Sequence, residues 1–136
     1  MITYRKLNGY KYELLAGYIH ADVDIKSGFV GNEYVALDNG TLLINKGYAW
    51  DGASGPTIDT LNSMRGSLVH DALYQLMREK YIGLENREMA DKLLRDVLIE
   101  DGMSKCRAGL WYWAVRKFAK QSAIKDKHPR GEVIEI

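Results

Sequence analysis

His70 and Asp71 are adjacent in the segment LVHDALYQL, whose apolar residues recur with the spacing of an α-helix. Side chains three and four positions apart share one face of a helix, so Tyr74 is a neighbour of both residues. A histidine can remove a proton from water when a carboxylate on its far ring nitrogen fixes the tautomer. The segment therefore predicts a site for acid–base chemistry, provided that such a carboxylate lies nearby.

Asp91 is the carboxylate that can complete this site. It stands in ADKLLRDVLIEDG, where it borders the apolar face of a second predicted helix. The alternative is an exposed acid that pairs with Arg87 and Arg95, each four positions away on its own helix. We predict that His70 and Asp91 lie within hydrogen-bonding distance or are bridged by one water molecule.

A glycine-rich loop, GYAWDGASGPTIDT, precedes the His-Asp helix. Gly52 and Gly55 predict a sharp turn just after a strand, because glycine adopts backbone angles that other residues avoid. One interpretation is that the backbone carbonyls and the carboxylates of Asp51 and Asp71 converge on a cation. The other is that Asp51 caps the following turn and belongs to a buried polar network. The sequence leaves both open.

His70 also has a purely structural interpretation. A histidine at the edge of an apolar stripe is commonly a core residue whose ring is bonded to a backbone carbonyl. Gly66, one helical turn earlier, favours the opposite, because a residue without a side chain leaves open space beside the imidazole. The sequence therefore leaves two interpretations open: a His70 that faces a pocket and a His70 packed at the edge of the core.

The first half of the chain, residues 1–50, predicts β-strands. It is rich in Tyr, Ile, Leu and Val, and Gly17 divides its first part into two short runs. The pair Asn39-Gly40 lies between two apolar runs, which is the strongest short signal for a hairpin.

The second half, residues 57–123, predicts helices. Three stretches carry apolar residues at helical spacing; Gly102 ends the second, and Ser104 is placed to cap the third. Residues 125–136 form a polar tail. The fold class predicted for the single domain 1–136 is α+β, a small N-terminal antiparallel sheet followed by three packed helices.

Composition and charge exclude several classes of protein. The chain has 136 residues, 46% of them hydrophobic, and a net charge of +1, so it offers no strong electrostatic case for nucleic acid. Cys106 is the single cysteine, which rules out an intramolecular disulfide. The chain contains no apolar run of membrane-spanning length, and MITYRKLNGY lacks the apolar core of a signal peptide.

The third predicted helix is both aromatic and basic. We assign a buried aromatic face to Trp111, Tyr112 and Phe118, with the basic side chains, Arg116 included, projecting elsewhere. Aromatic rings interleaved with basic residues can also stack on single-stranded bases. Because no known nucleic-acid motif is present, the core interpretation is favoured and nucleic acid is not a predicted partner.

The segments YAWDGASGP, SLVHDALY and ADKLLRDVLIEDG, in this order, resemble the phage and prophage family called domain of unknown function 1353. The resemblance covers roughly residues 45 to 118 and includes the His-Asp-x-x-Tyr motif. It implies a phage-encoded small accessory or virion protein, associated with the tail. Such a protein would reside in the host cytoplasm or the virion and would bind phage structural proteins.

The same order of motifs resembles the phospholipase A2 core, in particular the disulfide-free version found in parvovirus capsids. This resemblance implies a calcium-dependent ester hydrolase that acts at a lipid surface. His70 would be the general base, Asp71 the calcium ligand, and Tyr74 with Asp91 the pair that orients the histidine.

The loop would then be the calcium loop of such an enzyme. Gly52 and Gly55 would lie in it, and Asp51 would add a carboxylate ligand of its own. Calcium prefers six to eight oxygen ligands, which loop carbonyls and carboxylates provide. A third class, the His-Asp phosphohydrolases, needs further metal-binding histidines on helices, whereas His20 falls in a predicted strand and His128 in the tail. The sequence therefore leaves an accessory protein and a hydrolase as the two competing functions.

Overall fold

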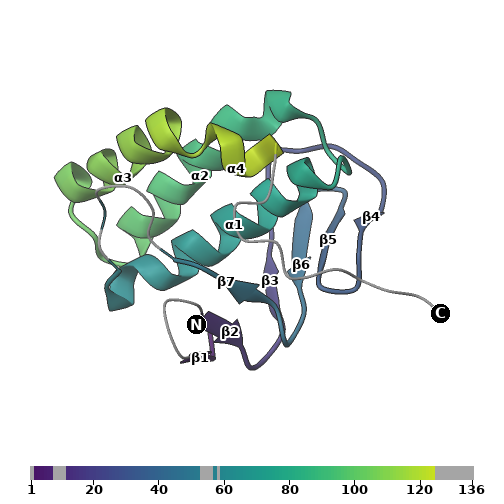
Figure 1. Ribbon diagram of the computed structural model, residues 1–136, viewed down its shortest axis with the longest axis horizontal. Coiled ribbons are helices and arrows are strands. Elements are labelled where there is room, and N and C mark those ends of the chain that lie inside the picture. Colours follow the sequence, from purple (N-terminus) through teal and green to yellow (C-terminus); the bar gives the residue numbers. More distant parts are fainter. Residues whose placement is uncertain (1, 8–11, 53–56, 58, 125–136) are drawn as a thin grey trace.

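The computed structural model describes residues 2–7, 12–52, 57 and 59–124. Every described strand precedes the helices, so the predicted α+β class is confirmed. Figure 1 shows the helices together on one side of the molecule and the strands on the other. The predicted polar tail lies outside the described residues.

The described strands form two antiparallel sheets, where the sequence predicted one. The first has the order β1-β2-β7, in which Tyr12 is opposite Trp50; its strands are β1 (Tyr4–Lys6), β2 (Tyr12–Leu14) and β7 (Ala49–Trp50). The second has the order β3-β6-β5-β4; its strands are β3 (Tyr18–His20), β4 (Val30–Gly31), β5 (Val35–Asp38) and β6 (Thr41–Ile44). The chain bends at residues 15 and 16, between β2 of the first sheet and β3 of the second.

The hairpin between β5 and β6 follows the prediction from its turn residues. Asn39 has φ of 48° and Gly40 has φ of 88°, so both occupy the left-handed region that such turns require. This turn sets the register that places Val35, Leu37, Leu42 and Ile44 in the core.

The described part of the helical half contains the three predicted helices, two 3₁₀ turns and one short helix that was not predicted. Ser104 caps the third helix, since its side chain accepts a hydrogen bond from Arg107 N at 3.2 Å. Gly102, with φ of 101°, follows the end of the second helix, as predicted. The elements are η1 (Leu61–Ser63), α1 (Met64–Arg78), η2 (Leu84–Asn86), α2 (Arg87–Glu100), α3 (Lys105–Phe118) and α4 (Lys120–Ile124).

Helix α1 is the central element, because it contacts both sheets through β5 and β7 and packs against α2 and α4. Its fully buried side chains include Leu68, Leu73 and Leu76. Helix α3 packs on α2 and α4, so it lies further from the sheets than α1. The His-Asp motif therefore stands on the most enclosed helix of the molecule.

Gly66 allows α1 and α2 to approach each other closely. A Cβ atom at this position would lie 2.9 Å from Leu98 Cδ2 and 3.3 Å from Leu94 Cδ1, both on α2. Our expectation that Gly66 leaves open space beside the imidazole was wrong, because the space is filled by the second helix.

Changing Gly66 to alanine is expected to lower the free energy of unfolding by about 1–3 kcal/mol, because the added methyl group overpacks the contact between α1 and α2. Gly109→Ala is the matched control. It also lies in a helix, but its Cβ meets open space, so alanine there is expected to stabilise by about 0.5–1 kcal/mol. Chemical denaturation of both variants measures the difference; equal effects would contradict the packing role of Gly66.

Candidate functional site

Asp91 lies at the centre of a buried polar cluster. Its side chain is completely buried on α2, yet it accepts hydrogen bonds from residues of two other helices. His70 Nε2 and Tyr74 Oη lie 2.7 and 2.6 Å from its Oδ1, and Arg116 Nη1 lies 2.8 Å from its Oδ2. We call these four residues the Asp91 network.

The α1 side of the network follows from helical spacing. His70 and Tyr74 are four positions apart, so they share one face of α1, with ring centroids 4.1 Å apart. The predicted approach of His70 to Asp91 is confirmed, because the close packing of α1 on α2 brings the carboxylate to the imidazole.

Two arginines complete the cluster in ways that the sequence did not reveal. Arg116, expected to project elsewhere, donates to Asp91 from α3. Arg87 was the proposed partner of an exposed Asp91, but it donates instead to Tyr74 Oη at 2.9 Å and to the backbone carbonyls of Val115 and Arg116. The interpretation of Asp91 as an exposed surface acid was therefore wrong. The available signal was the absence of any acid in α3, which leaves its arginines to pair elsewhere.

Contacts within the Asp91 network offset the cost of burying its charged groups. Burial opposes a charged imidazole, but the hydrogen bond to Asp91 and the negative charges of Asp71 and Asp91 outweigh it and raise the pKa of His70. Burial also disfavours an ionised Asp91, yet the bonds from His70, Tyr74 and Arg116 together lower its pKa. For Tyr74, burial and the charge of Asp91 raise the pKa, so its hydroxyl remains a neutral donor.

The second ring nitrogen of His70 faces Asp71. Nδ1 lies 3.9 Å from Asp71 Oδ1, which is too long for a hydrogen bond but close enough for electrostatic attraction. Asp71 is partly exposed, and its Oδ2 lies 3.4 Å from the backbone N of Asp51. The buried side of His70 thus meets Asp91, and its other side meets the edge of the loop.

The start of the loop is anchored to α1 and shaped by glycine. Trp50 Nε1 donates to the buried Ser67 Oγ at 3.0 Å. Gly52 has φ of 83°, and a Cβ there would lie 2.5 Å from the carboxylate of Asp59, which was not among the predicted site residues. Tyr12 Oη donates to this carboxylate at 2.8 Å. The turn predicted at Gly52 is present, whereas Gly55 lies outside the described residues.

The donors beside His70 have the chemistry that calcium prefers, although only in part. Asp71 offers one partly exposed carboxylate, but the loop backbone group that it meets is the amide N of Asp51, which cannot bind a cation. Within the described ranges, however, no group of three or more His, Cys, Asp or Glu side chains is arranged to hold a metal ion. The calcium interpretation of the sequence adds backbone oxygens of the loop and the carboxylate of Asp51 as further ligands.

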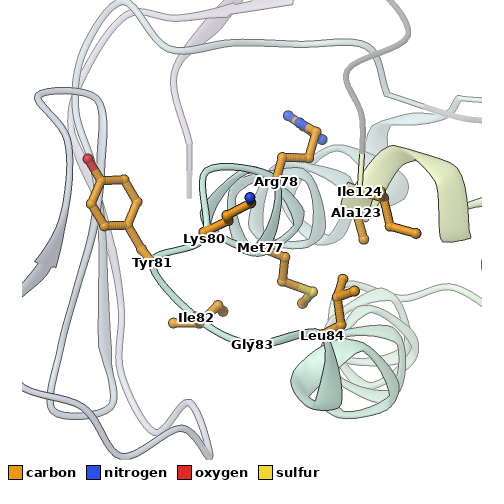
Figure 2. A pocket seen from close by; sticks show the side chains of 9 residues that line it. All are labelled: Met77, Arg78, Lys80, Tyr81, Ile82, Gly83, Leu84, Ala123 and Ile124. Carbon is orange, nitrogen blue, oxygen red and sulfur yellow. The ribbon is translucent and has the colours of Figure 1, made fainter.

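A cavity of about 290 Å³, separate from the Asp91 network, lies at the C-terminal end of α1. Figure 2 shows its lining, which comes from the last turn of α1, the segment 80–84 and the end of α4. None of the residues of the Asp91 network lines it. The cavity therefore does not give access to His70.

A protein family described as a protein of unknown function (DUF1353) matches residues 29–115. The chain belongs to this family. The DUF1353 match includes His70, Tyr74 and Asp91 but ends one residue before Arg116. No curated protein and no solved structure matches the chain. Membership of DUF1353 brings no established activity, so a function has to be argued from the site.

The described helices of the DUF1353 chain can be compared with the requirements for crossing a membrane. None of their helices is both long enough and apolar enough to cross a membrane. This finding agrees with the expectation that the chain does not span a membrane.

Proposed function

We propose that the chain is an ester hydrolase in which His70 acts as general base. The observation that carries the proposal is the 2.7 Å contact between His70 Nε2 and Asp91 Oδ1. The lowered pKa of Asp91 keeps it an ionised acceptor, so Nε2 carries the proton of a neutral ring and Nδ1 carries the lone pair. Nδ1 is the nitrogen that faces Asp71 and the loop.

The chemistry follows from this orientation. Nδ1 removes a proton from water while the water oxygen attacks the carbonyl carbon of the ester. The bond to the leaving alkoxide then breaks, and the imidazolium returns the proton to that oxygen, which yields a carboxylic acid and an alcohol. Asp91 stabilises the imidazolium, and Tyr74 and Arg116 hold Asp91 in place.

Calcium is the cofactor that the phospholipase resemblance implies. Asp71 and the backbone around Asp51 and Gly52 would hold it, and when bound it supplies positive charge that polarises the ester carbonyl. Lipid esters are the substrate class that this resemblance favours.

The test is release of fatty acid from short-chain phosphatidylcholine, in millimolar calcium and in excess chelator. We expect hydrolysis only with calcium, and we expect Asp71→Asn to abolish the calcium-dependent rate. Asp96→Asn is the matched control, because Asp96 is an exposed acid on α2. Equal rates in chelator and calcium, or an unaffected Asp71→Asn variant, would refute the calcium role.

A phage accessory or virion role is the second candidate. The observation that favours it is the complete burial of Asp91 with both of its oxygens hydrogen-bonded, as in a network that specifies a fold. In this case phage structural proteins are the partners, and mass spectrometry of purified particles would detect the chain. Its absence from the particles would restrict the accessory role to the host cytoplasm.

A further inference from the structure

Helix α3 exposes an apolar stripe next to a lysine. Leu110, Trp113 and Phe118 are each nearly half exposed, at 45, 47 and 46%. Positions 110, 113 and 117 follow one another at helical spacing, so Lys117 lies on the same face. We call these four residues the α3 stripe. Phe118 was predicted in the buried aromatic face, which was wrong, whereas Trp111 is in the core.

The α3 stripe is organised before any partner binds. The Trp113 and Phe118 rings meet edge to face, with centroids 5.8 Å apart at 86°. Lys117 Nζ lies 5.1 Å from the Trp113 centroid and 5.9 Å from the Phe118 centroid. The ammonium group therefore shares one surface with two exposed rings.

The charge around the stripe is positive. Residues 105–124 contain five Lys or Arg and no Asp or Glu. Arg116 is paired with Asp91, but Lys105, Lys117 and Lys120 form no ion pair with any residue that the structure describes. The stripe thus combines exposed apolar side chains with cations that are available to an anionic partner.

We propose that the α3 stripe docks the protein on an anionic lipid surface. Tryptophan, phenylalanine and leucine insert at the boundary between headgroups and acyl chains, while lysines attract the anionic headgroups. The lysine stem lies along the apolar boundary and keeps its ammonium group in water. This docking goes beyond the proposed hydrolysis and does not require His70.

Two other partners fit the stripe less well. Single-stranded nucleic acid would stack on aromatic faces, but Lys117 covers one face of Trp113, and Leu110 offers nothing to a base. In a symmetric dimer formed through the stripe, the same patch would face itself, and residues 105–124 offer no Asp or Glu to its lysines. An anionic lipid surface satisfies both the apolar and the cationic side chains.

Tryptophan fluorescence tests the proposal directly. The chain has three tryptophans, of which Trp50 and Trp111 are buried at 3 and 2% exposure, so changes in solvation report Trp113. We expect the emission to shift to shorter wavelength with vesicles of phosphatidylglycerol and phosphatidylcholine. Pure phosphatidylcholine is expected to give a much weaker shift. High salt should weaken the binding to anionic vesicles, because it screens the lysines.

The variants separate the contributions of charge and apolar contact. Lys117→Gln and Lys120→Gln are each expected to weaken binding in vesicle co-sedimentation roughly fivefold. Trp113→Ser is expected to weaken it about tenfold, through lost apolar contact. Phe29→Ser is the matched control, since Phe29 is an exposed aromatic residue outside the helices, and it should leave binding unchanged.

The measurements are made in chelator with the His70→Gln variant, so that hydrolysis plays no part. Binding in this variant supports docking even if the ester hydrolase proposal fails. Equal binding to neutral and anionic vesicles, or no effect of Trp113→Ser, would overturn the proposal. If only a single-stranded oligonucleotide shifts the Trp113 emission, the stripe binds nucleic acid instead. If the emission shifts only with rising protein concentration and sedimentation shows dimers, the stripe binds a second copy of the chain instead.

Discussion

Asp91→Asn is expected to lower the free energy of unfolding by about 3–5 kcal/mol. The carboxylate accepts from His70, Tyr74 and Arg116 with no exposure to solvent. An asparagine side chain keeps the shape but replaces one acceptor oxygen with a donor NH₂ group. At least one of the three donors then faces another donor, and Arg116 loses its buried counter-charge.

Urea denaturation followed by circular dichroism measures this loss. Asp96→Asn, on the exposed side of the same helix, is the control and is expected to change stability by less than about 0.5 kcal/mol. Arg116→Gln combined with Asp91→Asn should cost less than the sum of the two single changes, because both remove the same contact. Similar losses from Asp91→Asn and Asp96→Asn would show that the network does not stabilise the fold.

His70→Gln is expected to reduce the rate of ester hydrolysis by a factor of about 100 to 10,000, which is the usual contribution of a general base. Glutamine keeps a polar side chain near Asp91 but has no basic nitrogen. The pH profile provides a second readout. The pKa of His70 is raised above its ordinary value, so its neutral, basic form becomes populated at a higher pH than in a free histidine.

Initial rates between mildly acidic and alkaline pH test this prediction. The wild-type rate should rise with pH and then level off above the pKa of His70, whereas the residual rate of His70→Gln should lack that step. Urea denaturation of the variant establishes that it is folded. A folded His70→Gln variant with an unchanged rate and pH profile would exclude His70 as the base.

Local features of the sequence predicted much of the fold. The Asn39-Gly40 turn needs only two residues that tolerate positive φ, so its hairpin could be predicted without any tertiary contact. The three long helices follow from apolar spacing within each segment, and Ser104 marks one start through a bond to its own helix. The sheets were harder to predict, because β2 pairs with β7 and β3 pairs with β6, and these partners lie many residues away in the sequence.

For the site, the sequence was sufficient to predict the face of α1 that carries His70 and Tyr74, and the position of Asp91 at the border of an apolar face. Helical spacing is enough for both, because it orders side chains within one element. The elements that supply the remaining contacts are set by the packing of the helices on one another. Leu98 of α2 packs against Gly66, where we expected open space, and Arg116 of α3 bonds to Asp91 on the adjacent helix α2. These contacts depend on the angles at which α1, α2 and α3 cross. The crossing angles are set by the packing of whole helix faces and cannot be read from the spacing of residues within one helix.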